Sequence, residues 1–278
     1  MKTFKKLNCH PRKSKKRETC YEDNDLIFLR DNWNIQRPEL KIVAVQPKEI
    51  WSELKNRIAD CPQELCWIDK VVKDSSVKSK FYNNFVPKRP SSWNQNKNEW
   101  LDSNNIKDVM VQYSEVHKNF LFLGPSPIDF DTKINNVCVW PELCNLSIKD
   151  QIKKGITKIG IVLNLDKHTE GGSHWVSIFI DLKRKYIFYF DSCDGDIPKE
   201  VKTFSYKIKE QCKKLNIKLR LFNNKGLQHQ LGTTECGIYV LYFIINLLQE
   251  TKSVNYFKKN RIPDEEMETF RSIYFNKL

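Results

Sequence analysis

The sequence predicts an α+β protein, because segments of strand character in the middle of the chain are bordered by helical patterns on both sides. Residues 175–181 and 186–191 are β-rich runs separated by a short basic segment, which predicts a hairpin. After them, residues 201–215 place apolar side chains along one face of a helix that starts near Pro198. Residues 237–248 are apolar on nearly every side, which predicts a buried helix.

Two further strands and one further helix complete the expected core. Ile106, Val109, Met110 and Tyr113 recur at helical spacing after the polar segment 102–105, which predicts a capped helix that faces the core. Short apolar or alternating runs at residues 159–165 and 218–222 predict the additional strands.

The chain divides into three parts on composition. Residues 1–17 predict a disordered basic arm, and residues 18–95 an N-terminal extension of unassigned role with a helix at residues 47–58. Pro, Ser, Asn and Lys are concentrated in residues 87–98, which is typical of a linker. Residues 96–278 then form the main domain.

The net charge of +13 is largely a property of the first 17 residues, which hold eight Lys and Arg and no acidic residue. Residues 18–278 carry a net charge of only +5. The arm could make weak nucleic-acid contacts or direct the chain to the nucleus, or it could be a solvated terminus; the sequence favours neither.

The composition argues against several other classes. No apolar segment follows Met1 as in a secretory signal, and residues 237–248 are too short to span a bilayer, so we expect an intracellular protein without membrane contact. The nine cysteines are an odd number, and we expect small buried hydrophobic side chains rather than a disulfide framework. The spacing of Cys61 and Cys66, or of Cys138 and Cys144, does not fit zinc knuckles, so neither a metal nor a cofactor is expected.

Cys236 is the candidate nucleophile. It immediately precedes the predicted buried helix, whose partial positive N-terminus favours a thiolate. Gly237 beside it leaves backbone space for a substrate to approach. A structural cysteine at a helix start is the alternative, and for Cys236 taken alone it is the better one.

A histidine and a carboxylate can accompany this thiol. His174 stands at the start of one strand of the predicted hairpin, and Asp191 ends the other, so the two lie side by side. The carboxylate would hold the imidazole tautomer and stabilise the imidazolium. An exposed strand end and a turn residue are the alternative roles, but their coincidence with Cys236 favours a Cys-His-Asp triad.

Three segments together resemble the ubiquitin-like-protein (SUMO-specific) protease superfamily: GGSHWVSIFID (171–181), YIFYFDS (186–192) and HQLGTTECGIYVLYF (229–243). The segment EWLDSNNIKDVMVQY (99–113) is similar to the family's Trp-Leu-Asn-Asp helix start, with Asp102-Ser103 in place of Asn-Asp. The resemblance covers about residues 96–278 and implies a papain-like core. It also implies that Gln230 and the Cys236 backbone form an oxyanion hole, and that Trp100 and Trp175 clamp the Gly-Gly end of a substrate. Core packing is the alternative role for both tryptophans.

Within the superfamily, GGSHWVSIFID and the closing RIPDEEMETFRSIYF (261–275) resemble the virion-maturation proteases of large DNA viruses, of the African swine fever virus type. The resemblance implies cleavage of viral structural polyproteins after a Gly-Gly-type sequence, in the virion and the host cytoplasm. A deconjugase acting on SUMO or another ubiquitin-like modifier is the second hypothesis. A non-catalytic protein that binds nucleic acid or a modifier is the third.

Overall fold

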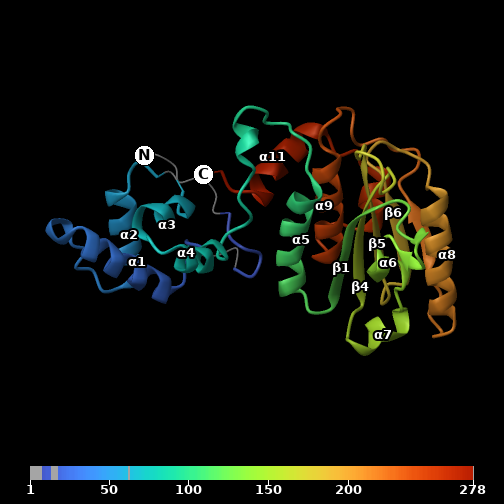
Figure 1. The fold of residues 1–278 in the computed structure, drawn as a ribbon, viewed down its shortest axis with the longest axis horizontal. Coiled ribbons are helices and arrows are strands. Elements are labelled where there is room, and N and C mark those ends of the chain that lie inside the picture. The colour runs from blue at the N-terminus through green and yellow to red at the C-terminus, as the bar shows by residue number, and fades with distance from the viewer. Residues whose placement is uncertain (1–7, 14–17, 62, 278) are drawn as a thin grey trace. The chain divides into compact units, whose positions relative to one another are not determined.

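The computed structural model describes residues 8–13, 18–61 and 63–277, and two compact units divide the chain (Figure 1). The first comprises Met1–Pro90 and Ser272–Leu278, and the second Ser91–Arg271. The sequence placed the boundary at 95/96 and assigned the whole C-terminus to the main domain. The last residues instead belong to the first unit, because Asn276 exchanges backbone hydrogen bonds with Pro87 (2.8 Å) and Arg89 (2.9 Å).

The first unit is helical in its described part. Its elements are α1 (Asp23–Gln36), the 3-10 turn Pro38–Leu40, α2 (Pro47–Arg57), α3 (Leu65–Val71) and α4 (Ser75–Tyr82). Helix α1 packs on α2 and α3, and α3 packs on α4. A separate apolar core that includes Leu29, Ile50 and Trp67 lies among them. The helix expected at residues 47–58 corresponds to α2.

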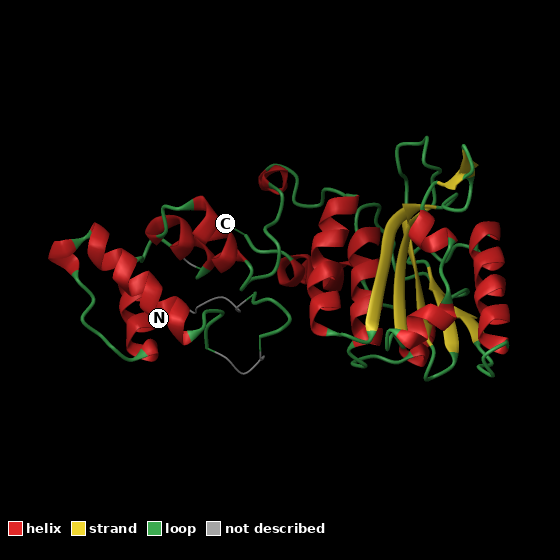
Figure 2. Cartoon of the chain, turned by 60° about the horizontal axis from the view of Figure 1, so that its bottom comes forward, coloured by secondary structure: helices red, strands yellow, loops and turns green. Residues whose placement is uncertain are grey.

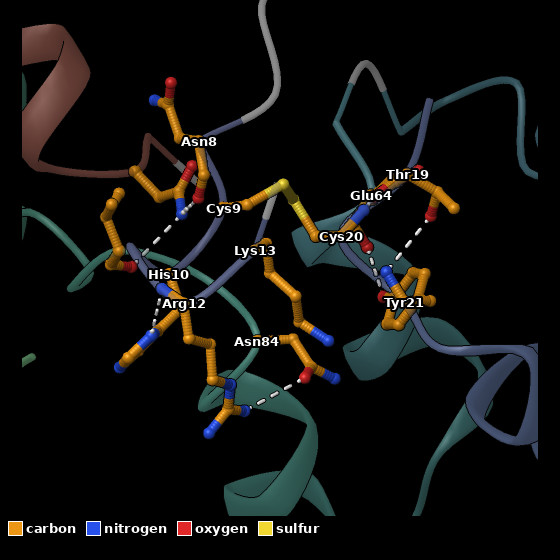
Figure 3. The surroundings of a disulfide bond; sticks show 12 residues. Asn8, Cys9, His10, Arg12, Lys13, Thr19, Cys20, Tyr21, Glu64 and Asn84 are labelled. Carbon is orange, nitrogen blue, oxygen red and sulfur yellow. Dashed lines mark hydrogen bonds between the residues drawn. A yellow bond between two sulfur atoms is a disulfide. The ribbon is translucent and has the colours of Figure 1, made fainter. Parts of the chain in front are cut away.

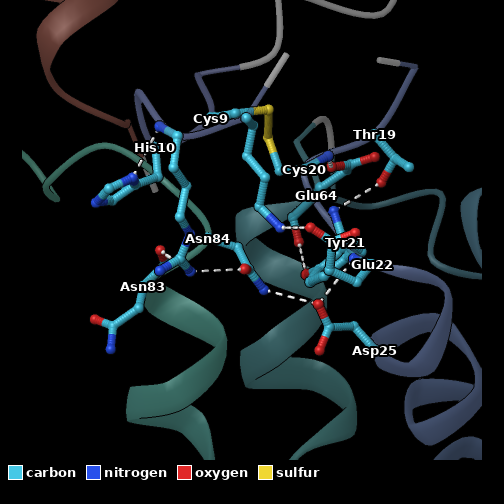
Figure 4. Close-up of polar contacts among 12 residues, drawn as sticks. Cys9, His10, Thr19, Cys20, Tyr21, Glu22, Asp25, Glu64, Asn83 and Asn84 are labelled. Atoms are coloured by element: carbon cyan, nitrogen blue, oxygen red, sulfur yellow. Dashed lines mark hydrogen bonds and ion pairs between the residues drawn. A yellow bond between two sulfur atoms is a disulfide. The ribbon is translucent and has the colours of Figure 1, made fainter. Parts of the chain in front are cut away.

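Part of the expected disordered arm is ordered. Residues 1–7 and 14–17 lie outside the described residues, but His10 is only 3% exposed, and Cys9 forms a disulfide with Cys20 (Figure 3). Asn84 accepts a hydrogen bond from Arg12 (3.2 Å) and donates one to Asp25 (3.0 Å), as Figure 4 shows. The basic side chain of Arg12 is therefore engaged in a contact within the first unit.

The expectation about cysteine pairing was wrong. Besides Cys9–Cys20, the structure pairs Cys61 with Cys66 and Cys138 with Cys144, and it leaves Cys193, Cys212 and Cys236 free. The Cα atoms of the paired residues are 5.2 to 6.4 Å apart, within the usual reach of a disulfide. The pairs are close because turns bring sequence neighbours together, which counting cysteines does not reveal.

The second unit has the α+β architecture predicted from the sequence. Its sheet has the order β1-β4-β5-β6-β7, with β1 parallel to β4, β6 parallel to β7 and the remaining neighbours antiparallel. The strands are β1 (Phe120–Pro127), β4 (Lys158–Asn164), β5 (Trp175–Asp181), β6 (Tyr186–Phe190) and β7 (Arg220–Asn223). Strand β1 was not predicted from the sequence; it ends in Gly-Pro-Ser-Pro, residues that are more typical of loops than of strands.

Helices cover both faces of this sheet, which Figure 2 shows between them. Helices α5 (Ser103–Val116) and α9 (Cys236–Leu248) pack on one face. On the other face, α8 (Lys199–Lys213) packs its apolar side chains against alternate residues of the strands. The smaller elements are β2 (Lys133–Ile134), β3 (Val137–Cys138), α6 (Pro141–Cys144), α7 (Ile148–Lys153), α10 (Val254–Lys259), α11 (Asp264–Tyr274) and the 3-10 turn Ser91–Asn94.

Candidate active site

The β5–β6 hairpin brings His174 and Asp191 together. Ser177 on β5 pairs with Phe190 on β6, so the residue before β5 and the residue after β6 leave the sheet at the same edge. The Nε2 atom of His174 lies 2.7 Å from Oδ1 of Asp191. Their side chains are 17% and 4% exposed, so the pair is shielded but reachable from one side.

Cys236 is the second group that acts on the His174 ring. Since Nε2 faces Asp191, Nδ1 is the ring nitrogen that remains for Cys236. Burial alone would lower the pKa of His174, but the interactions with Asp191 and Cys236 outweigh it and raise the pKa to about 9. The structure therefore brings together the three side chains predicted as a triad, with His174 hydrogen bonded to Asp191 and influenced by Cys236.

Asp191 is held by groups that the sequence analysis did not identify. Burial favours its neutral form, yet the hydrogen bond from His174 and backbone donors lower its pKa. The Cys193 N–H donates to Oδ1 at 2.8 Å. The Asn224 side chain accepts from the Asp191 N–H (3.0 Å) and donates to its carbonyl (2.7 Å). Asn224 follows β7, the parallel neighbour of β6. Its position directly after the end of a strand was the one feature of the sequence that could have indicated its closeness to Asp191.

Gly195 is the second residue that the sequence analysis missed. A Cβ at this position would lie only 2.3 Å from Oδ2 of Asp191, well inside van der Waals contact. A glycine is therefore required for the loop to approach the carboxylate this closely.

Cys236 is the first residue of α9 and is 3% exposed. Every residue of this helix is buried, which anchors the nucleophile in the core. The expectation that Gly237 leaves room for substrate was wrong, because Leu101 takes that space. A Cβ on Gly237 would lie 2.7 Å from Cβ of Leu101. The glycine thus lets the segment that carries Trp100 approach the nucleophile.

Gln230 lies beside the Asp191 segment. Its backbone N–H donates to the Ser192 carbonyl (2.8 Å), and its side-chain oxygen accepts from the Ser192 hydroxyl (2.8 Å). The side-chain nitrogen donates one hydrogen to Gly232 (3.0 Å), so one amide hydrogen is left for another acceptor. The contacts with Ser192 and Gly232 therefore fix the orientation of the amide group, with its oxygen toward Ser192 and its nitrogen toward Gly232.

The two predicted clamp residues differ in exposure. Trp100 is 47% exposed, so it does not have the core-packing role considered for it, whereas Trp175 is 8% exposed. The Trp175 indole N–H donates to the Leu101 carbonyl at 2.8 Å. Both tryptophans line a hollow of about 770 Å³ that extends to Ile134, Trp140 and Gly172. The hollow is also lined by Ser173, the residue that precedes His174 in the chain.

A buried ion pair connects the two segments that carry Cys236 and Trp100. Arg271 contacts both carboxylate oxygens of Glu235, at 3.0 and 3.1 Å, and donates to the Glu99 carbonyl at 2.7 Å. The side chains of Arg271 and Glu235 are 7% and 4% exposed. Burial raises the pKa of Glu235, and Arg271 opposes that rise. Neither residue was singled out from the sequence.

Two other histidines of the second unit, His168 and His229, have separate partners. His229 accepts from the Ile262 N–H and lies 3.1 Å from the Phe257 carbonyl. Burial lowers its pKa to about 4, which keeps it neutral. His168 lies 2.7 Å from Asp129. The rings of His229 and His168 are therefore engaged with groups other than Cys236.

None of the helices in the described part of the chain combines the length and apolar character needed to cross a membrane.

Comparisons with known proteins agree with this geometry. Residues 156–278 match the Ulp1 protease family, C-terminal catalytic domain. A thiol protease of Acanthamoeba polyphaga mimivirus is 29% identical over 64% of this chain and 57% of its own length. The cysteine protease of a Malawi tick isolate of African swine fever virus is 30% identical over 63% of this chain and 67% of its own.

The SUMO-1 cysteine protease of a Kenyan isolate of the same virus is 35% identical over 45% of this chain and 46% of its own length. The matches therefore span roughly half to two thirds of the length of these three relatives. The crystal structure of the African swine fever virus protease shares the fold. It superposes with a TM-score of 0.69 and covers 99% of this chain and 98% of that one, at 22% identity. Together with the sequence matches, the fold shows that this chain belongs to the Ulp1 protease family of cysteine proteases.

Proposed function

We propose that this chain is a cysteine endopeptidase that cleaves after a Gly-Gly-type sequence. The observation that carries the proposal is the chain of contacts from Asp191 through His174 to Cys236, with 2.7 Å between Asp191 and His174. The thiol lies at the N-terminus of a buried helix, which favours its anion. The family relationship supports the same activity.

The reaction follows from the positions of these groups. The Cys236 thiolate attacks the carbonyl carbon of the second glycine, and the spare Gln230 amide hydrogen and the Cys236 N–H would receive the developing oxyanion. His174 transfers its Nδ1 proton to the leaving amine, which yields a thioester and a neutral imidazole. Water then attacks the thioester and gives its proton to His174, which regenerates the thiolate–imidazolium pair.

Trp100 and Trp175 would select glycine in the substrate. Both line the hollow beside His174, and only a backbone without side chains passes easily between two indole rings. His168 and the apolar Ile134 and Trp140 also line this hollow, where upstream residues of an extended substrate would lie.

Within this activity, we favour the processing of viral structural polyproteins during virion maturation, in the virion and the host cytoplasm. The named viral relatives and the shared fold support this role. Removal of SUMO or another ubiquitin-like modifier is the second candidate, since the matching family is named for Ulp1. A non-catalytic binding protein is disfavoured by the intact contacts of Cys236.

The test compares kcat/KM for a short Gly-Gly-X peptide with that for the same bond fused behind folded SUMO or ubiquitin. Similar values would support the polyprotein role, because the enzyme would then read only the extended strand. An increase of orders of magnitude with a folded modifier would contradict it and support deconjugation. The Cys236→Ala variant is the inactive control, and Cys212→Ala, in a helix away from the site, is its matched active control.

We also propose weak nucleic-acid contact by residues 1–17, from their eight basic side chains. The affinity for a short duplex should fall steeply with salt and should weaken when residues 1–7, which carry three of the eight basic side chains, are removed. An unchanged affinity in that truncation would contradict the proposal.

A further inference from the structure

The turn after β6 places a third potential metal ligand beside the His174–Asp191 pair. Cys193 is a free, exposed cysteine, and its backbone N–H donates to Oδ1 of Asp191 at 2.8 Å. This contact folds the turn back toward the carboxylate. One ligand atom from each of His174, Asp191 and Cys193 can be chosen so that all three lie within 4.8 Å of one another.

The three donors form a set suited to zinc. Imidazole nitrogen, thiolate sulfur and carboxylate oxygen bind Zn²⁺ at about 2.0–2.3 Å, so ligand atoms around one tetrahedral ion lie about 3.3–3.8 Å apart. Ligand atoms that are up to 4.8 Å apart therefore have to approach each other by up to about 1 Å, which the exposed Cys193 side chain can supply by rotating. Nε2 and Oδ1 are closer, at 2.7 Å, because a proton joins them; a metal ion that replaces this proton would move them apart.

The surroundings also suit a metal ion. The Asp191 backbone is held on both sides by Asn224, which restrains the carboxylate as an outer hydrogen-bond partner does in metal sites. The exposure of Cys193 leaves a path from solvent and room for a water molecule as the fourth ligand. Cys236 acts on the His174 ring, whose Nε2 is directed at Asp191, so it is not needed as a ligand.

We propose that His174, Asp191 and Cys193 form a site for a thiophilic divalent cation of the Zn²⁺ class, and that occupancy reversibly inactivates the enzyme. Binding releases the Cys193 thiol proton and the Nε2 proton of His174 to solvent. The metal-bound ring then keeps its Nδ1 proton but carries no positive charge, so giving that proton to the leaving amine would leave an imidazolate, and the ring is a much weaker acid. It also loses the support of Asp191. The inhibitory part of this inference rests on the proposed protease activity, whereas metal binding does not.

Metal binding is tested without turnover, using Co²⁺ and the Cys236→Ala variant in oxygen-free buffer without a reductant, which keeps the three disulfides intact and prevents new ones. We expect a thiolate-to-cobalt absorption band at stoichiometric Co²⁺, because Cys193 remains. The band should vanish in the Cys236→Ala/Cys193→Ser double variant and persist in Cys236→Ala/Cys212→Ala. Absence of the band in Cys236→Ala, or its persistence without Cys193, would overturn the site.

Inhibition is tested by titrating the active enzyme with Zn²⁺ and following cleavage of the Gly-Gly-X peptide. With each enzyme normalised to its own activity without zinc, Cys193→Ser should need at least tenfold more Zn²⁺ for half-inhibition than the wild type, while Cys212→Ala should match the wild type. EDTA should restore activity. Equal zinc sensitivity of wild type and Cys193→Ser would show capture by Cys236 alone and overturn the proposed inactivation. If neither enzyme cleaves any peptide, the proposed function fails, but the cobalt result still decides the metal site.

Discussion

Replacing Asp191 by asparagine separates the charge of this residue from its role in orienting His174. Oδ1 accepts hydrogen bonds from both His174 Nε2 (2.7 Å) and the Cys193 N–H (2.8 Å). Two donors therefore favour placing the amide oxygen of an asparagine at the same point. The ring should keep its tautomer, with Nδ1 directed at Cys236, and lose only the stabilisation by a full negative charge.

The size of the effect follows from the pKa of His174, which rises from 6.5 to about 9 although burial opposes the charge. At ~1.36 kcal/mol per pKa unit, the imidazolium gains roughly 3 kcal/mol from its surroundings. Asp191 and Cys236 share this gain, so the variant should lose part of it. We expect the pKa of His174 to move at least one unit toward 6.5. Because general acid–base catalysis contributes ~10²–10⁴-fold, we expect kcat/KM to fall roughly ten- to a hundredfold near pH 7.5.

The assay is the pH profile of kcat/KM for Asp191→Asn, Asp191→Ala and wild type with the Gly-Gly-X peptide. The wild-type alkaline limb should lie near pH 9, where the imidazolium is lost, and Asp191→Asn should shift it to lower pH. Asp191→Ala should lose at least tenfold more activity, because nothing orients the ring. An unshifted alkaline limb in Asp191→Asn, or equal losses in both variants, would refute the electrostatic and orienting roles respectively. Circular dichroism and the melting temperature serve to check that both variants fold.

Three further predictions concern Cys236, Gly195 and the Arg271–Glu235 pair. Cys236→Ala should fold normally and lose cleavage by orders of magnitude, as measured with the peptide; turnover near the wild-type rate would contradict its role as nucleophile. Gly195→Ala places a methyl group 2.3 Å from the Asp191 carboxylate and should lower kcat up to about a hundredfold by displacing it, whereas an unchanged kcat would show that the loop yields freely. Arg271→Ala leaves the Glu235 charge buried without its partner and should lower the free energy of unfolding, measured in urea, by about 3–5 kcal/mol. Adding Glu235→Gln should recover part of that loss. If the losses of the two single variants simply add in the double variant, the two residues do not form a direct pair.

Several features of the fold and the site could be predicted from local patterns. Helix α9 was recognisable because residues 237–248 are apolar on all sides, and the β5–β6 hairpin because two β-rich runs flank a short basic segment. That hairpin also predicts the meeting of His174 and Asp191, since the ends of paired strands lie together. Strand β1 was missed because its proline-containing end conceals the parallel pairing with β4.

The amino-acid sequence by itself determined the α+β class and the family and predicted the triad residues, since each depends on residue type and order along the chain. The tertiary structure alone decided which distant residues support the triad. Asn224 contacts Asp191 across 33 residues of sequence, and Arg271 contacts Glu235 across 36. Gly195 is only four residues from Asp191, but its close approach to the carboxylate depends on how the turn folds. Such contacts depend on how strands and helix ends converge in space. For the same reason the sequence-based expectation that Gly237 leaves room for a substrate was wrong. The space beside Gly237 is taken by Leu101, which is 136 residues away in the chain.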